Sequence, residues 1–188
     1  MKMIDLAKIE KLELLSNSND NSDIMDLIDN LTDIRKFGYE NRNTYEKILF
    51  KLLNNKDEDI RIQSAFTLSS WESPKFKKPL FNMMQNDKSP QVRSSCIKFY
   101  CYYYMSGTKD KKLIELLYSY ILNKELFTWI RSQSIVGIIY VYYGKDNITG
   151  AERLKLGDFG TYSKDESFED AIPWGKIKKI LNDLNTTF

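Results

Sequence analysis

Residues 57–71, DEDIRIQSAFTLSSW, decide the fold, because two later stretches of the chain repeat their pattern. These are SPQVRSSCIKFYCYY at residues 89–103 and FTWIRSQSIVGIIYVY at residues 127–142. Each copy has a branched apolar residue followed by arginine, and the arginines are 32 and 38 residues apart: Arg61, Arg93 and Arg131. A period of this length indicates stacked pairs of helices.

The positions around each arginine define one face of a helix. The third residue after the arginine is small in all three copies, and the seventh is apolar or aromatic. Together with the residue before the arginine, these positions have helical spacing and predict a buried stripe. They are Ile60, Ser64 and Leu68; Val92, Cys96 and Tyr100; and Ile130, Ser134 and Ile138.

An amphipathic segment precedes each copy, at residues 43–53, 74–85 and 111–122, so three helix pairs are expected over residues 44–143. Ser73-Pro74 and Ser89-Pro90 each place a capping serine before a proline, as at a helix start. Pro79 lies inside the helix expected over 75–86, which therefore begins after it or bends.

This pattern resembles the HEAT-repeat family, in which an acidic turn, a Val-Arg-like pair and a small residue open the second helix of each hairpin. The resemblance covers residues 44–143 and departs from the family at Phe99, at Gly137 and in the 38-residue step. It implies an all-α fold: a short right-handed α-solenoid of HEAT-like antiparallel helical hairpins with capping helices. It also implies that the three arginines are structural and bond to a neighbouring turn carbonyl or carboxylate.

We expect a single domain over residues 1–188. Residues 1–43 contain two amphipathic segments, 3–15 and 22–36, that predict N-terminal capping helices. Residues 144–172 have four of the eight glycines and no sustained period, which predicts an irregular acidic loop with one short helix near 149–156. Residues 173–188 predict a C-terminal capping helix.

The chain has no histidine, which removes the commonest general base and the commonest metal-binding imidazole. Neither a dinucleotide-binding nor a P-loop glycine motif occurs. Cys96 and Cys101 fit neither a disulfide framework nor a zinc site, so we expect buried free thiols. Sites that need histidine are excluded, whereas carboxylate, lysine, tyrosine or cysteine chemistry stays open. We expect no catalytic residues, no metal site, no cofactor and no enzymatic activity, with a DNA glycosylase as the alternative.

The first fifteen residues carry Asp5, Glu10 and Glu13 where a signal peptide would be apolar. The longest apolar stretch, residues 135–143, is too short to cross a bilayer. We expect a cytoplasmic protein that does not bind membranes.

Charge is uneven although the formal net charge is only +2. Residues 61–145 have thirteen basic and five acidic residues, whereas residues 1–35 have four basic and eight acidic, and residues 146–170 have three and seven. A basic middle fits nucleic acid, an acidic protein or ordinary solvation of outward-facing lysines.

In HEAT-like stacks the second helices line the concave side, so their exposed positions are candidates for partner binding. Residues two, five and nine after each arginine share one face: Gln63, Phe66 and Ser70; Ser95, Lys98 and Tyr102; and Gln133, Val136 and Tyr140. Amides and aromatic rings of this kind suit protein recognition. A second candidate is the acidic loop, either docking on a basic partner or simply solvated: Asp165, Glu166, Phe168, Glu169 and Asp170.

The resemblance in size and architecture leads to one main hypothesis: a non-catalytic protein-binding module, an immunity protein that binds and neutralises a cognate bacterial toxin domain. Such a protein is expected to act as a monomer that binds its partner one-to-one. One alternative is a HEAT-like DNA-binding protein or DNA glycosylase, with which Trp71, Trp129 and the basic middle are compatible. Another alternative is an adaptor or scaffold subunit.

Overall fold

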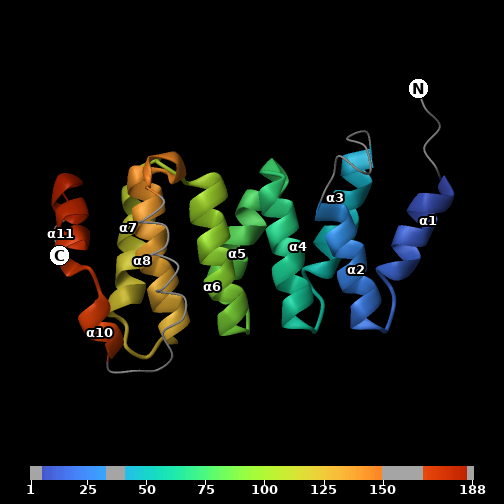
Figure 1. Ribbon diagram of the computed structural model, residues 1–188, viewed down its shortest axis with the longest axis horizontal. Coiled ribbons are helices and arrows are strands. Elements are labelled where there is room, and N and C mark those ends of the chain that lie inside the picture. The colour runs from blue at the N-terminus through green and yellow to red at the C-terminus, as the bar shows by residue number, and fades with distance from the viewer. Residues whose placement is uncertain (1–5, 33–40, 150–166, 186–188) are drawn as a thin grey trace. The chain divides into compact units, whose positions relative to one another are not determined.

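The computed structural model describes residues 6–32, 41–149 and 167–185 (Figure 1). Within these ranges the regular structure is helical and includes no β-strand, so the predicted all-α fold class is confirmed. The chain divides into two compact units, Met1–Phe76 (unit 1) and Lys77–Phe188 (unit 2). This boundary lies inside the predicted repeat region, residues 44–143.

Unit 1 contains two pairs of helices. α1 (Leu6–Leu15) packs against α2 (Asn21–Thr32), and α3 (Arg42–Leu52) packs against α4 (Glu58–Ser70). The second helices of the two pairs, α2 and α4, also contact each other. The pairs bury their branched and aliphatic side chains, among them Ile24, Leu27, Ile28, Leu31, Leu49, Ile60 and Leu68.

Unit 2 repeats this arrangement. α5 (Lys77–Asn86) packs against α6 (Pro90–Phe99), α7 (Lys111–Leu122) packs against α8 (Thr128–Tyr143), and α6 contacts α8. The C-terminal helices are α10 (Ser167–Ala171) and α11 (Trp174–Asp183), and α11 packs against α8. The helix predicted after Pro173 is therefore present.

The three registered arginines have the structural role that the HEAT-like pattern implies. Each donates to main-chain oxygens near the end of the first helix of its own pair. Arg61 Nη1 bonds Asn55 O at 2.9 Å, Arg93 Nε bonds Met84 O at 3.4 Å, and Arg131 Nε bonds Ile121 O at 2.9 Å. All nine residues of the predicted buried stripe are buried.

Helix α8 differs from the other repeats because it is buried on nearly all sides. The residues outside its predicted stripe, such as Ile135, Ile139 and Val141, are as buried as those within it. α6, α7 and α11 all pack against α8, and a helix that is apolar all round belongs in such a position. The predicted exposure of Val136 and Tyr140 is therefore wrong, since only 4% and 8% of these residues is exposed.

Prolines mark two helix starts. Ser89 Oγ accepts from Val92 N, with Pro90 in the first turn of α6, as predicted. Pro74 instead opens a short 3-10 helix, η3 (Pro74–Phe76), and α5 begins at Lys77. The helix predicted to begin at residue 75 thus starts later, which places Pro79 in its first turn, where a missing N–H costs no helical hydrogen bond.

The irregular segment predicted over residues 144–172 is described only at its two ends. These form a 3-10 turn, η5 (Lys145–Asn147), and the short helix α10. The short helix predicted near 149–156 lies outside the described residues except for Thr149. No helix among the described residues is long and apolar enough to span a bilayer.

Candidate functional site

The predicted partner-binding residues fall in both units. Gln63, Phe66 and Ser70 are half-buried on α4 in unit 1, where Ser70 Oγ bonds Thr67 O at 2.9 Å. In unit 2, Gln133 is half-buried two turns before Tyr140 on α8. Lys98 is exposed, and Tyr102 is half-buried.

The structure brings two of the predicted residues, Tyr102 and Tyr140, into direct contact. Their ring centroids lie 5.2 Å apart with an interplanar angle of 88°. Tyr103 packs against Tyr102 in the same edge-to-face manner, at 4.9 Å and 80°. Edge-to-face packing is a favoured arrangement because the positive edge of one ring meets the negative face of the other.

A second pair of tyrosines lies on the last turn of α8. The rings of Tyr142 and Tyr143 are 4.8 Å apart at 80°. Tyr142 Oη donates to Asp183 Oδ2 at 2.7 Å, and this hydrogen bond to the carboxylate raises the pKa of Tyr142 above its usual 10.0. The phenol is thus held in its neutral, hydrogen-bonding form.

Three lysines place their ammonium groups over these rings. Lys145 Nζ lies 5.2 Å from the ring centroid of Tyr102 and 5.9 Å from that of Tyr103. Lys109 Nζ lies 5.0 Å from the Tyr142 centroid, and Lys176 Nζ 5.0 Å from the Tyr143 centroid. These are cation–π distances. We call the set the tyrosine–lysine cluster; its members are Tyr102, Tyr103, Tyr140, Tyr142, Tyr143, Lys109, Lys145 and Lys176.

A change of helical pitch accompanies the first tyrosines. α6 runs directly into a π-helical turn, η4 (Tyr100–Tyr104), which Met105 N closes by bonding Tyr100 O at 3.2 Å. A π-helical turn contains an extra residue and so changes which side chains share a face. Tyr102 and Tyr103, whose rings are in contact, both lie in this turn.

Two glycines join this turn to the end of α8. Gly107 and Gly144 have φ angles of +72° and +82°, which favour glycine, and both of their N–H groups donate to Tyr140 O. Lys109 N donates to Val141 O at 2.9 Å, and Lys145 N to Ser106 Oγ at 2.6 Å. The backbone that positions the cluster is therefore fixed by hydrogen bonds rather than by side-chain packing alone.

The second predicted site, the acidic loop, is only partly described. Asp165 and Glu166 lie outside the described residues, and Asp170 is exposed. Phe168 is only 2% exposed, so its ring belongs to the core of unit 2.

Phe168 lies beside an ion pair between the buried Arg131 and the partly exposed Glu169. Arg131 Nη2 lies 2.6 Å from Glu169 Oε1, and the guanidinium carbon of Arg131 lies 4.9 Å from the Phe168 ring centroid. Glu169 and Phe168 thus have contacts within unit 2, whereas Asp170 is exposed.

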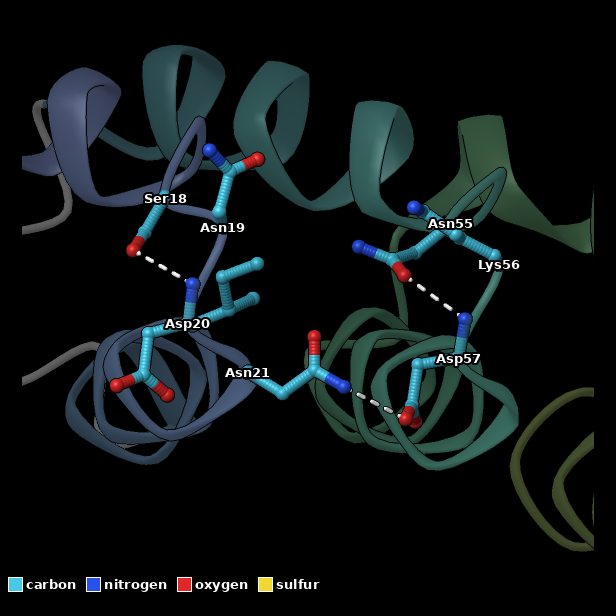
Figure 2. A pocket seen from close by; sticks show the side chains of 8 residues that line it. Ser18, Asn19, Asp20, Asn21, Asn55, Lys56 and Asp57 are labelled. Carbon is cyan, nitrogen blue, oxygen red and sulfur yellow. Dashed lines mark hydrogen bonds between the residues drawn. The ribbon is translucent and has the colours of Figure 1, made fainter.

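Unit 1 has an open groove of about 890 Å³ between the turns that precede α2 and α4. Figure 2 shows Asn21 reaching from the start of α2 to Asp57 at the start of α4, with Nδ2 and Oδ2 2.8 Å apart. Ser18 Oγ accepts from Asp20 N, and Asp57 Oδ1 accepts from Asp59 N and Ile60 N. The polar groups of this groove therefore serve as turn and helix caps, and no predicted site residue lines it.

Both cysteines lie in the core of unit 2. Cys96 and Cys101 are buried free thiols, as predicted, and burial raises the pKa of Cys101 far above its usual 9.0, which keeps it as an unreactive thiol. No group of metal-ligating side chains is found in the described parts of the chain.

The three lysines of the cluster were not among the site residues predicted from the sequence. Lys109 and Lys176 reach Tyr142 and Tyr143 from other elements, and the spacing of a single helix gives no signal for such a contact. Tyr142 and Tyr143 were visible as a tyrosine pair at the end of an apolar run, and the residues after them, Gly144 and Lys145, mark the helix end.

Comparison of the chain with protein-family models, with curated proteins and with solved structures finds no match.

Proposed function

We propose that this chain is a non-catalytic protein-binding module that recognises its partner through the tyrosine–lysine cluster of unit 2. The observation that carries the proposal is the edge-to-face contact of Tyr102 with Tyr140, with the ammonium group of Lys145 over the Tyr102 ring. Tyrosine is enriched at energetically dominant interface positions because it offers a large, rigid contact area and a hydrogen-bonding hydroxyl.

The cluster is suited to binding because its rings are fixed before any partner arrives. Each ring packs against a neighbour, and the η4 turn and the end of α8 are joined by main-chain hydrogen bonds. A preordered surface avoids much of the side-chain entropy that binding otherwise costs. Tyr102, Tyr103, Tyr142 and Tyr143 are all half-buried, so part of each remains accessible to a partner.

We further propose that the helices form a HEAT-like α-solenoid with capping helices. Each unit by itself supports this proposal, because the second helices of its two pairs contact each other. These contacts are between α2 and α4 in unit 1 and between α6 and α8 in unit 2. The arginine-to-carbonyl hydrogen bonds at corresponding positions of three pairs add to it.

The partner that this architecture favours is a cognate toxin domain, which the chain would neutralise in a one-to-one complex in the cytoplasm. This part of the proposal comes from the resemblance in size and helical-hairpin design to HEAT-like immunity proteins. An adaptor or scaffold subunit would use the same surface for a different partner. A toxin encoded next to this chain's gene would be the first candidate to test.

Affinity capture from a lysate of the native host tests the proposal. The wild-type chain is compared with the double variant Tyr102→Ala, Tyr142→Ala, and Tyr120→Ala, a half-buried tyrosine on α7 outside the cluster, is the control. We expect a protein that binds the wild type and Tyr120→Ala equally and the double variant at least about tenfold more weakly. Capture that the double variant leaves unchanged would contradict the proposal.

A further inference from the structure

We infer that the partner presents an acidic protein segment to the tyrosine–lysine cluster, so that aspartate or glutamate side chains meet Lys109, Lys145 and Lys176. This inference rests on the proposed function and specifies the chemistry of the partner. It follows from how the cluster arranges its charges and its ring faces.

Aromatic rings of η4 and of the last turn of α8 position the three ammonium groups. Their distances to the ring centroids are 5.0 Å for Lys109, 5.2 Å for Lys145 and 5.0 Å for Lys176. A cation held over a ring keeps its charge at a defined place, and an ammonium group has three donors, so it can still bond a carboxylate. Lys98 adds an exposed ammonium group one turn before Tyr102.

Three carboxylates on the elements around the cluster interact with other groups of the protein. Asp183 accepts from Tyr142 Oη, Asp110 caps α7 by accepting from Leu113 N at 2.9 Å, and Glu115 lies 3.9 Å from Lys111. Asp146, next to Lys145, is exposed. Along the chain, six lysines outnumber these four acids: Lys98, Lys109, Lys111, Lys112, Lys145 and Lys176. The region therefore complements a negatively charged partner.

The ring arrangement favours an acidic protein over a single-stranded nucleic acid. Proteins that bind single-stranded nucleic acids do so by stacking the bases on open aromatic faces. Here Lys145 covers faces of Tyr102 and Tyr103, while Lys109 and Lys176 cover faces of Tyr142 and Tyr143. The edge-to-face packing further limits flat stacking. What the cluster offers outward is ammonium groups and phenol rims, and these recognise carboxylates.

The test is a triple variant, Lys109→Gln, Lys145→Gln, Lys176→Gln, in the full chain. Its matched control is Lys56→Gln, Lys88→Gln, Lys124→Gln, which removes the same charge from three exposed lysines in other turns. Circular dichroism checks that both variants keep their helices. Both are used in the host-lysate capture described above, beside the tyrosine double variant.

The inference concerns the protein whose capture depends on Tyr102 and Tyr142. We expect this protein to bind the cluster triple variant about tenfold more weakly than it binds the wild type. Its affinity for the control triple variant should stay within about twofold of the wild-type affinity. Equal capture by the two triple variants overturns the acidic-segment inference but leaves the proposed function standing. If no captured protein depends on the two tyrosines, the proposed function itself fails.

Defined probes provide a second readout. A fluorescein-labelled peptide rich in aspartate and glutamate is titrated with the chain at low salt, beside its asparagine and glutamine counterpart and a labelled oligothymidylate. We expect binding of the acidic peptide that the cluster triple variant weakens and the control does not. Preference for the oligothymidylate, or equal binding of the acidic and amide peptides, would overturn the inference.

Discussion

Arg131 and Glu169 form the shortest described ion pair in unit 2, with 2.6 Å between Nη2 and Oε1. The arginine belongs to the repeat pattern, whereas the glutamate comes from α10, after the irregular segment. Arg131 Nε bonds Ile121 O, so one buried guanidinium connects α7, α8 and α10. The counterparts Arg61 and Arg93 also bond main-chain oxygens.

We predict that Glu169→Gln lowers the free energy of unfolding by about 1 kcal/mol, because the glutamate is partly exposed and water screens the pair. Asp170→Asn, at an exposed position on the same helix, should change it by less than about 0.5 kcal/mol. Urea unfolding followed by circular dichroism measures both. Equal effects of the two variants would show that the pair does not hold α10.

Gly137 allows α8 to approach its neighbours closely. A Cβ added there would lie 2.9 Å from Cys101 Sγ and 3.1 Å from Leu117 Cδ1. Gly137→Ala should therefore destabilise the chain by about 1–3 kcal/mol through overpacking.

Gly175→Ala is the matched control for Gly137→Ala. A Cβ at Gly175, in α11, meets nothing within 4 Å, so this change should be neutral or stabilise by up to about 1 kcal/mol. The two variants are compared by the midpoint of thermal unfolding. A midpoint for Gly137→Ala at or above that of wild type would refute the close-packing explanation.

Glu46 in unit 1 should make the free energy of unfolding depend on pH in the acidic range. Burial by itself would raise the pKa of Glu46, but hydrogen bonds from Ser73, Lys75 and Arg42 outweigh burial and lower it below the usual 4.5. A carboxyl group whose pKa is lower in the folded state stabilises that state above the unfolded pKa. This stabilisation is complete above about pH 4.5 and is lost as the pH falls through the lowered value.

We predict that Glu46→Gln costs about 1–2 kcal/mol at neutral pH, because charge-assisted hydrogen bonds are replaced by weaker ones. At pH 2 more of the wild-type carboxyl is protonated than at neutral pH, so the difference should be smaller. Glu10→Gln, on the exposed side of α1, is the control. Thermal unfolding at both pH values checks this; a difference that does not shrink in acid would contradict the assignment.

The repeat pattern predicted most of the fold because it depends on local spacing. Ile60, Ser64 and Leu68 could be assigned to one buried face from the helical period, and the capping role of Ser89 from its place before Pro90. The same spacing predicted an exposed Tyr140, which is in fact buried. Assigning one buried face to each helix ignores how many neighbouring helices pack around it. The run IVGIIYVYY is apolar on every side, which was the signal that α8 is central.

The candidate site was predictable only in part. Tyr102 and Tyr140 were predicted as site residues, and they are in contact. The lysines that cover the tyrosine rings come from distant segments of the chain, and local spacing gives no signal for such contacts. Lys109 and Lys176 are separated by 67 positions in the chain yet cover neighbouring rings.

The central claim, that the tyrosine–lysine cluster binds a protein, is tested most directly by quantitative capture from the host lysate with matched tyrosine variants. We predict a captured protein whose binding falls at least about tenfold with Tyr102→Ala plus Tyr142→Ala and is unchanged with Tyr120→Ala. Binding that is lost to the same extent in both variants, or in neither, would contradict the claim.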